Sequence, residues 1–400
     1  MELTTVKEAL EIILKNTHDF GTEEVDFLDA VGRILKEDIV ADRDFPPFDR
    51  VSMDGIAISS EEFNKGQREF KIEGVQAAGS EQLLLQNKNN CIEAMTGAIL
   101  PKNTDAVIQY EQLEITNGIA KILIDEVKYL KNVHKKGLDK KQGDVLIYKN
   151  TLISSAEIGV LATVGKSKVK VAKQPKVMIV STGNELVKVS EVPAEHQIRR
   201  SNVFTLVSLL NKFKIKAETA HILDNKETLL TKIDSFLNKY DVLIFSGAVS
   251  KGKFDFIPEV LDTLGVEKLF HRVKQKPGKP FWFGKKRNTT IFAFPGNPVS
   301  TFVSCLKYFY PWYQKSVGLN FKNKQQAILS EDFSFKQGLT YFLQVKLNVE
   351  EGKLLATPVA GKGSGDLANL VDADAFLELP DDRSNFTKGE VFPILMYRSF

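Results

Sequence analysis

The chain has little of what builds metal centres, disulfide frameworks or membrane spans. It has two cysteines, Cys91 and Cys305, that are far apart, and none of its five histidines stands in a metal-ligand pattern. This excludes a disulfide framework and a zinc-finger site. It also lacks the run of about 18 apolar residues that a membrane helix needs. The N-terminus has no basic segment followed by a long apolar core, as a signal peptide would have. We therefore expect a cytoplasmic protein without membrane contact.

An excess of charge of one sign is missing as well. The formal net charge is +3, from 54 Lys and Arg against 51 Asp and Glu. This is too small to indicate a nucleic-acid-binding protein. The 400 residues are 43% hydrophobic, contain no internal repeat, and are enough for two to four soluble domains.

The predicted secondary structure changes between helical and β-rich segments several times along the chain. Residues 1–40 predict two helices, the first begun by a capping box of Thr5 and Glu8, and residues 151–165 predict another helix. Short strands and turns lie between them, with Asn117-Gly118 marking a hairpin. A second hairpin is predicted around Glu350-Glu351-Gly352. We predict a helical connector (1–42 and 140–172), an inserted β-rich domain (43–139), an α/β domain (173–318) and a C-terminal β domain (319–400).

Residues 241–265 resemble a phosphate-binding loop. An apolar strand enters a Gly/Ser turn and an amphipathic helix leaves it, and Gly247, Gly252 and Lys253 have the spacing of a Walker A loop. The next position is Phe254, which has no hydroxyl to hold Mg²⁺, and Asp255 follows. The loop can bind phosphate through backbone N–H groups and a helix dipole, but it is not that of an ordinary NTPase.

Two further strand–turn–helix units flank the same region. Residues 289–310 carry Pro295-Gly296-Asn297-Pro298 in the turn, and residues 175–187 carry Gly183 and Glu185. Three such units predict a doubly wound parallel sheet whose loops gather at the carboxyl ends of the strands. The basic stretch 274–280 between them favours an anionic ligand. A single Gly/Pro-rich turn, by contrast, more often only connects a strand to a helix and binds nothing.

Three loops outside the α/β region also stand out. Residues 45–55 combine prolines and aromatics and end in Asp54-Gly55, residues 95–98 form a small-residue turn, and residues 136–139 form an acidic turn. Taken alone, the first loop is equally well explained as an ordinary β-turn, and the second is a weak signal. The third is more often a solvated surface turn than a site.

The motifs together resemble the molybdopterin molybdenumtransferase family, which includes the gephyrin E domain. Nearly the whole chain takes part, and the motifs occur in one order: FPPFDRVSMDGIAI, AMTGAILPKNTDAVIQYE, GLDKKQGDVL, STGNEL, SGAVSKGKFDF, PGKPFWFG and FPGNPVS. The resemblance implies an enzyme of molybdenum cofactor biosynthesis. Such an enzyme takes adenylylated molybdopterin and molybdate, cleaves the phosphoanhydride, releases AMP and leaves molybdenum on the pterin dithiolene.

The resemblance further implies an elongated homodimer of four-domain subunits, with each active cleft between the α/β domain of one subunit and the β-rich domain of the other. It also implies transfer contacts with a molybdopterin adenylyltransferase and with molybdoenzyme acceptors. A phosphoanhydride substrate calls for a divalent cation such as Mg²⁺. The acidic positions that match the family are Asp54, Asp139, Glu185, Asp224 and Asp255.

Roles for these positions follow from the family. Glu185, Asp224 and Asp255 would lie near the cation and the phosphates, and Asp54, Asp139 and Thr96 would close over them from the partner. The other predicted contacts to the phosphates, the anionic ligand or the dithiolene end are Gly247, Ser250, Gly252, Arg272, Lys276, Lys279, Pro295, Gly296, Asn297, Pro298 and Ser364.

The chain departs from the family pattern at a few positions. Asn184 stands where Asp is frequent, and Gln344 stands near a position that often carries a basic residue. Two alternatives remain open: a molybdopterin adenylyltransferase built on the same α/β domain, and a non-catalytic dimeric scaffold like the gephyrin E domain. The first lacks the two β domains, and the second has no need of the acidic positions.

Overall fold

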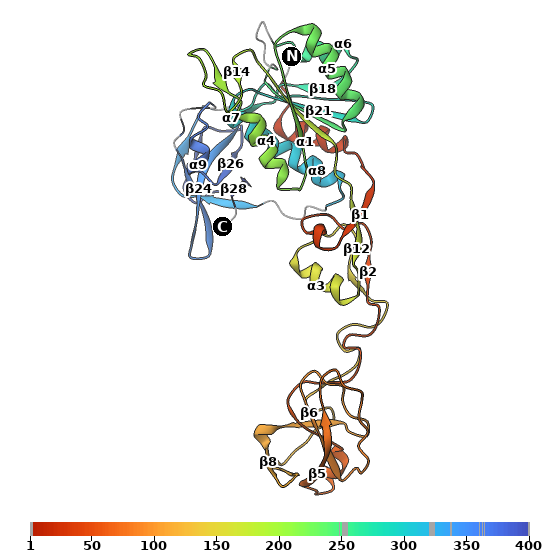
Figure 1. Cartoon of the computed structure of the whole chain (residues 1–400). Coiled ribbons are helices and arrows are strands. Elements are labelled where there is room, and N and C mark those ends of the chain that lie inside the picture. The colour runs from red at the N-terminus through yellow and green to blue at the C-terminus, as the bar shows by residue number, and fades with distance from the viewer. Residues whose placement is uncertain are drawn as a thin grey trace. The chain divides into compact units, whose positions relative to one another are not determined.

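The structure is a computed structural model that describes residues 3–247, 249, 255–319, 325–336, 338–359, 361, 363 and 365–398. The chain forms two compact units (Figure 1). The larger comprises Met1–Glu37, Asn150–Ser155 and Lys168–Phe400, and the smaller comprises Asp38–Lys149 and Ala156–Ser167. None of the helices in the described part of the chain combines the length and apolar composition that crossing a bilayer requires. The finer division into four domains stays a prediction.

A six-stranded sheet in the order β16-β13-β17-β21-β20-β18 forms the centre of the larger unit. The first four strands are parallel, and β20 and β18 continue the sheet in antiparallel fashion. The α/β fold class predicted from the sequence is confirmed, with two antiparallel strands that were not predicted. The strands are β13 (Val177–Thr182), β16 (Glu218–Ile222), β17 (Val242–Ser246), β18 (Glu267–His271), β20 (Trp282–Lys286) and β21 (Thr289–Phe294).

Helices cover both faces of this sheet. Met178 and Val180 of β13 pack toward α5 and α6, whereas Val177 and Ile179 pack toward α1, α4, α7 and α8, as the alternation of a buried strand requires. Figure 1 shows the two helix layers on either side of β18 and β21. The helices are α1 (Val6–Lys15), α4 (Asn202–Asn211), α5 (Lys226–Lys239), α6 (Ile257–Thr263), α7 (Pro298–Ser304) and α8 (Tyr310–Ser316), with a π-helical turn at Cys305–Phe309 between the last two.

The N-terminal segment has one of the two predicted helices. Helix α1 begins at the predicted capping box, in which the Thr5 hydroxyl accepts from the Glu8 backbone and the Glu8 carboxylate accepts from the Thr5 backbone. The second helix predicted within residues 1–40 is wrong. That region forms strand β1 (Thr22–Asp26) and a 3₁₀ turn at Leu28–Ala30. Strand β1 pairs antiparallel with β12 (Lys168–Ala172), a partner too distant in sequence to be seen from local pattern.

The C-terminal part of the larger unit is a closed β-structure. Its order is β19-β24-β25-β22-β28-β26, and pairing of β24 with β26 closes it. The predicted hairpin is confirmed, because β24 and β25 flank Glu351 (φ 50°) and Gly352 (φ 75°). The elements are β19 (Gln275–Lys276), β22 (Gln326–Leu329), β23 (Phe333–Ser334), β24 (Thr340–Glu350), β25 (Lys353–Pro358), α9 (Asn369–Asp372), β26 (Ala375–Leu379), β27 (Asn385–Phe386) and β28 (Val391–Met396).

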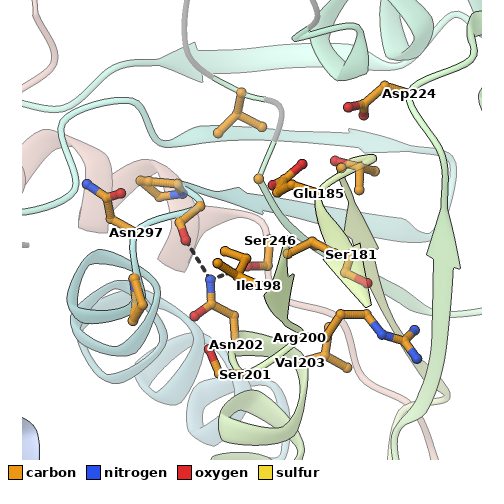
Figure 2. Close-up of a pocket in the computed structure, with 18 of the residues that line it drawn as sticks. Ser181, Glu185, Ile198, Arg200, Ser201, Asn202, Val203, Asp224, Ser246 and Asn297 are labelled. Atoms are coloured by element: carbon orange, nitrogen blue, oxygen red, sulfur yellow. Dashed lines mark hydrogen bonds between the residues drawn. The ribbon is translucent and has the colours of Figure 1, made fainter. Parts of the chain in front are cut away.

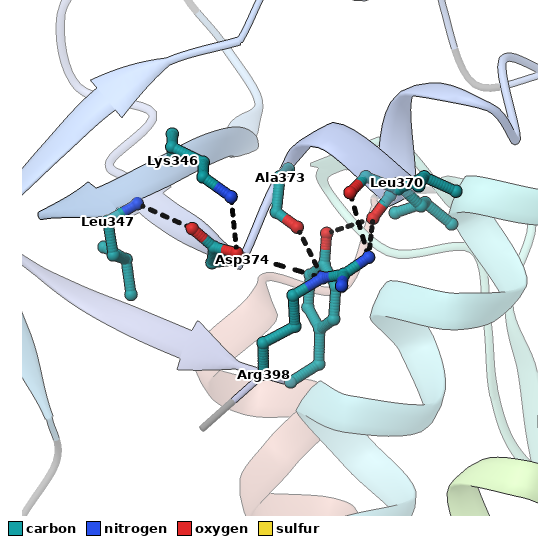
Figure 3. Close-up of polar contacts among 8 residues, drawn as sticks. Lys346, Leu347, Leu370, Ala373, Asp374 and Arg398 are labelled. Carbon is teal, nitrogen blue, oxygen red and sulfur yellow. Dashed lines mark hydrogen bonds and ion pairs between the residues drawn. The ribbon is translucent and has the colours of Figure 1, made fainter. Parts of the chain in front are cut away.

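A polar network fastens the end of the chain to this β-structure (Figure 3). Buried Asp374 accepts from the Leu347 backbone at 3.0 Å and from Lys346 Nζ at 3.1 Å, and lies 3.8 Å from Arg398 Nε. Arg398 also donates to the carbonyls of Val371 and Ala373 at the end of α9. A cation at this position satisfies carbonyls that the short helix leaves without partners.

The smaller unit contains a six-stranded sheet in the order β7-β4-β6-β5-β9-β8. The predicted hairpin is confirmed, since β8 and β9 flank Asn117 (φ 52°) and Gly118 (φ 76°). Gly55 begins β4 so close to β7 that a Cβ there would lie 1.9 Å from the Ile108 carbonyl oxygen. The elements are β2 (Ile39–Val40), β3 (Arg50–Val51), β4 (Gly55–Ile58), α2 (Ser60–Asn64), β5 (Glu69–Gln76), β6 (Asn90–Ala94), β7 (Ala106–Gln109), a 3₁₀ turn (Tyr110–Gln112), β8 (Leu113–Thr116), β9 (Ile119–Ile122), β10 (Val133–His134), β11 (Val145–Ile147) and α3 (Ser155–Thr163).

Candidate active site

A pocket of about 510 Å³ opens at the carboxyl ends of the four parallel strands. The chain passes from β13 to β16 on one side and then to β17 on the other, so the loops diverge between β13 and β17. Such a divergence is where open α/β sheets place their ligands. The pocket brings together eight of the residues predicted from the sequence, namely Glu185, Asp224, Asp255, Gly247, Pro295, Gly296, Asn297 and Pro298.

The carboxylates of the pocket repel one another. Burial raises the pKa of Asp224, and the negative charges of Glu185 and Asp255 raise it further. The Asp224 backbone is fixed by a 3.1 Å hydrogen bond to Asn184 Oδ1, while its own Oδ1 is buried without a hydrogen-bond partner in the described structure. A buried acceptor in a field of like charge is unfavourable unless a cation or a donor reaches it.

These oxygen donors fit a hard divalent cation in their chemistry. Among the described residues, however, no group of three or more His, Cys, Asp and Glu side chains is arranged to hold a metal ion. Mg²⁺ in phosphate-binding sites commonly takes one or two carboxylates from the protein and further oxygens from the substrate. The observed arrangement is consistent with a site that is completed only by a bound phosphate.

The Glu185 carboxylate occupies space that is free only because residue 183 is a glycine. Gly183 has a φ of 137°, and a Cβ on it would lie 2.6 Å from both carboxylate oxygens of Glu185. The carboxylate therefore folds back over the glycine backbone at the end of β13. Any side chain at position 183 would displace Glu185.

The start of α4 ties two of the pocket loops together. Asn202 Nδ2 donates to the Gly296 carbonyl at 2.7 Å and to Ser246 Oγ at 3.0 Å (Figure 2). Ser201 and Asn202 themselves line the pocket. Because α4 has ten residues, its unpaired first N–H groups add positive potential at this wall.

Sequence reasoning missed several pocket residues. They are Ser181, Thr182, Arg199, Arg200, Ser201, Asn202 and Ser246. The run Arg199-Arg200-Ser201-Asn202 was a usable signal, because Ser and Asn favour helix starts and two cations precede them. It was overlooked because it does not directly follow a strand of the central sheet.

The three predicted cations lie outside the lining of this pocket, although Pro280, next to Lys279, is part of it. Lys276 Nζ lies 4.9 Å from the ring centroid of Tyr341 in the C-terminal β-structure. Arg272 has a φ of 78° and donates its backbone N–H to Phe281. The roles predicted for Arg272, Lys276 and Lys279 stay predictions.

The smaller unit gathers the predicted residues of the β-rich part. Asp54 Oδ1 accepts from the Thr96 backbone N–H at 2.6 Å, and this hydrogen bond lowers the pKa of Asp54. Asp139 Oδ1 lies 2.9 Å from His134 Nε2, and β10, which carries His134, pairs with β3. The loops predicted to act together therefore lie in one region of this unit. Ser250, Gly252 and Ser364 lie outside the described residues.

Comparisons with known proteins cover almost the whole chain. Residues 4–165 match the MoeA N-terminal region (domain I and II), residues 178–315 a probable molybdopterin binding domain, and residues 326–397 the MoeA C-terminal region (domain IV). The molybdopterin molybdenumtransferase of Synechocystis sp. is 40% identical over 399 residues, which are 98% of this chain and 99% of that protein. That of Staphylococcus epidermidis is 31% identical over 405 residues, which are 99% and 96% of the two chains.

A solved structure agrees with the sequence relatives. The molybdopterin biosynthesis moeA protein of Pyrococcus horikoshii OT3 superposes with a TM-score of 0.84 at 30% identity, over 99% of this chain and all of that one. The fold and its order of domains are thus shared along the full length. The chain belongs to the molybdopterin molybdenumtransferase family.

Proposed function

We propose that this chain inserts molybdate into adenylylated molybdopterin and releases AMP, giving molybdenum cofactor. The observation that carries the proposal is the pocket itself, where Glu185, Asp224 and Asp255 meet the phosphate-loop residue Gly247 and the turn Pro295–Pro298. The carboxylates suit a cation bound to phosphate, and the glycine turns let a phosphate approach the backbone. In the reaction an oxygen of water or molybdate forms a new P–O bond as the phosphoanhydride bond breaks, and AMP leaves. The two dithiolene sulfurs form bonds to molybdenum as molybdate oxygen leaves with the thiol protons as water.

Each group of residues has a proposed task. Glu185, Asp224 and Asp255 would hold Mg²⁺ together with phosphate oxygens of the substrate, and the bound cation would offset the charge of the phosphates and polarise phosphorus. The residues proposed to cradle the phosphates are Gly247, Ser250 and Gly252. Those proposed to bind the anionic ligand or the dithiolene end are Arg272, Lys276, Lys279, Ser364 and the turn Pro295, Gly296, Asn297 and Pro298.

The two alternative functions are less well supported. An adenylyltransferase built on the α/β domain would not need the N-terminal and C-terminal regions, yet both match the family here. A scaffold without catalysis would not need Asp224 with an unpartnered buried oxygen among other carboxylates. The molybdenumtransferase uses both features.

We also propose that the enzyme works as a homodimer. Helix α3 (Ser155–Thr163, SAEIGVLAT) carries apolar residues on most of its circumference, interrupted by Glu157, yet Leu161 is its only buried residue in the described chain. A helix with this composition is normally buried, so we propose that a second copy of the chain packs against its exposed apolar residues. Asp54, Thr96 and Asp139 of one copy would then close the pocket of the other.

A complementation experiment tests the shared site. Asp54→Ala and Asp255→Ala chains are each expected to be inactive, and a purified mixed dimer should recover activity at one of its two pockets. Verified mixed dimers without activity would show that each site uses a single chain. The cytoplasmic location and the contacts with a molybdopterin adenylyltransferase and with molybdoenzyme acceptors stay predictions from the sequence.

The decisive assay for the reaction is AMP release from adenylylated molybdopterin when molybdate is added. The parental chain should release AMP in a way that depends on Mg²⁺, and Asp255→Asn should lose this release while still binding the pterin. Asp234→Asn is the matched control, because Asp234 lies on the exposed face of helix α5 with its carboxylate 3.9 Å from Lys286 Nζ. A parental chain that releases no AMP would overturn the proposal.

A further inference from the structure

Arg200 is a cation in the pocket wall without a counter-ion. It lines the pocket, and its Nε is buried with no hydrogen-bond partner. Among the ion pairs of the described chain, none includes Arg200, although the same pocket contains Glu185 and Asp224. An unsatisfied buried donor is unfavourable in the free protein, and a bound oxyanion would relieve it.

The backbone of Arg200 is fixed to the loop that carries Glu185. Strands β14 (Leu186–Val187) and β15 (Ile198–Arg199) pair in parallel, and the Ile198 N–H donates to the Glu185 carbonyl at 2.9 Å. The Arg200 N–H then donates to the Val187 carbonyl at 3.1 Å. Figure 2 shows the Arg200 side chain extending away from the Glu185 carboxylate, with Asp224 on the far side of Glu185. The pairing of β14 with β15 thus fixes the backbone of Arg200 relative to that of Glu185, and both residues line the same pocket.

No carboxylate of the described chain forms an ion pair with Arg200, although Glu185 and Asp224 lie near enough to act on the same neighbour, His221. Burial lowers the pKa of His221, and the positive charge of Arg200 lowers it further. A histidine of this kind stays a neutral imidazole, and its Nδ1 lies 3.2 Å from the Ser181 carbonyl oxygen. An imidazole beside the guanidinium cannot neutralise it, so the charge of Arg200 remains available to a ligand.

The neighbouring Arg199 shows a different use of the same residue type. Its Nε donates to the Glu191 carbonyl at 2.9 Å, within the loop between β14 and β15. Arg199 thereby holds the loop closed. The donor of Arg200 has no such contact in the described structure.

We propose that Arg200 binds oxygens of the substrate's phosphoanhydride directly. The proposal rests on the proposed function. A guanidinium presents paired N–H donors whose geometry matches a phosphate, and such charge-assisted bonds are about twice as strong as neutral ones. Arg200 would hold the phosphates from the loop that also positions Glu185, so cation and phosphate would be placed by one element.

Binding of ADP, a stable phosphoanhydride, to the full-length chain with Mg²⁺ tests the proposal. Arg200→Gln should weaken ADP binding by about tenfold or more, the least expected for losing a hydrogen bond to a charged group. Arg200→Lys should recover part of this loss. Adenosine, which has no phosphate, should bind both variants as it binds the parental chain. Lys188→Gln removes a nearby surface cation that pairs with Glu191, and is the matched control.

The outcomes separate this inference from the proposed function. Suppose that the parental chain binds ADP and releases AMP. If Arg200→Gln then binds ADP as tightly as the parental chain does, the role of Arg200 is overturned and the proposed function is not. An equal loss for adenosine and ADP would indicate a disturbed fold and also overturns it. A parental chain that binds ADP but releases no AMP from adenylylated molybdopterin overturns the proposed function, and with it this role.

Discussion

The side-chain amide of Asn202 donates a hydrogen bond of 2.7 Å to the carbonyl oxygen of Gly296. The same nitrogen donates to Ser246 Oγ at 3.0 Å. One side chain at the start of α4 therefore joins the last residue of β17 to the loop after β21. The pocket depends on this junction, because both segments line it.

Asn202→Ala should loosen the junction. We expect a loss of about 0.5–1.5 kcal/mol in the free energy of unfolding, the range for the net contribution of a hydrogen bond, because Ser246 is buried but Gly296 is exposed. We also expect weaker AMP binding. Asn238→Ala is the matched control, since Asn238 Nδ2 makes one exposed bond to the Asp234 carbonyl within α5. Urea denaturation and AMP titration check both variants. Equal behaviour of the two variants would show that Asn202 does not organise the pocket.

Gly183→Ala should disturb Glu185 more than the fold. The Cβ would lie 2.6 Å from the Glu185 carboxylate oxygens, so Glu185 has to move. Gly389→Ala is the control, because Gly389 has a φ of 94° and nothing within 4 Å of its Cβ position. Both variants should lose about 1–3 kcal/mol through backbone strain. Only Gly183→Ala should lose the Mg²⁺ dependence of AMP release, and unchanged dependence would argue that Glu185 holds no cation.

Local pattern was enough for much of the fold. The parallel strands are short apolar runs followed by Gly or Pro turns, so β13, β17 and β21 could be placed from the sequence. Strand β1 could not, because TEEVD has one apolar residue and becomes a strand only through its partner β12. The π-helical turn at Cys305–Phe309 also carries no local signal.

The site residues likewise fall into those that local sequence pattern predicts and those that it does not. Glu185 and Asp255 were visible because each follows a predicted strand and turn, and Asp224 was reached through the family resemblance. Asn202 and Arg200 were not found, because their importance depends on hydrogen bonds and on a missing counter-ion. Those relations arise from tertiary packing. The run Arg199-Arg200-Ser201-Asn202 indicates a helix start preceded by two cations, but not the contacts that these side chains make.

A buried ion pair joins the π-helical turn to the C-terminal β-structure. Lys307 Nζ lies 2.6 and 2.7 Å from the carboxylate oxygens of Glu378, and the two side chains are 7% and 19% exposed. Lys307→Met should cost about 3–5 kcal/mol of unfolding free energy, because Glu378 is left buried without its counter-charge. Adding Glu378→Leu should restore most of the loss, since an apolar pair of similar volume is often tolerated.

An exposed pair serves as the control for this prediction. Lys226 and Glu259 lie 2.6 Å apart with side chains 43% and 60% exposed, so Lys226→Met should cost about 1 kcal/mol or less. Thermal or urea unfolding of the three variants and the parental chain gives the comparison. A double variant no more stable than Lys307→Met would show that packing around the turn, and not the unpaired Glu378 charge, sets the loss.

The ionisation of Asp224 should destabilise the protein free of Mg²⁺. Its pKa in the folded state is raised above the ordinary value of 3.8, first by burial and then by Glu185 and Asp255. The folded state therefore binds more protons than the unfolded state between these two pKa values, and stability falls as the pH rises through that window. Asp224→Asn should raise the melting temperature at pH 7, and this gain should shrink as the pH is lowered toward 3.8.

Mg²⁺ should stabilise the parental chain at pH 7 more than it stabilises the Asp224→Asn variant, because the cation relieves the repulsion that the variant has already removed. Asp234→Asn should keep the parental response to Mg²⁺. An Asp224→Asn variant that gains no stability at pH 7 and responds fully to Mg²⁺ would show that Asp224 neither repels its neighbours nor binds the cation.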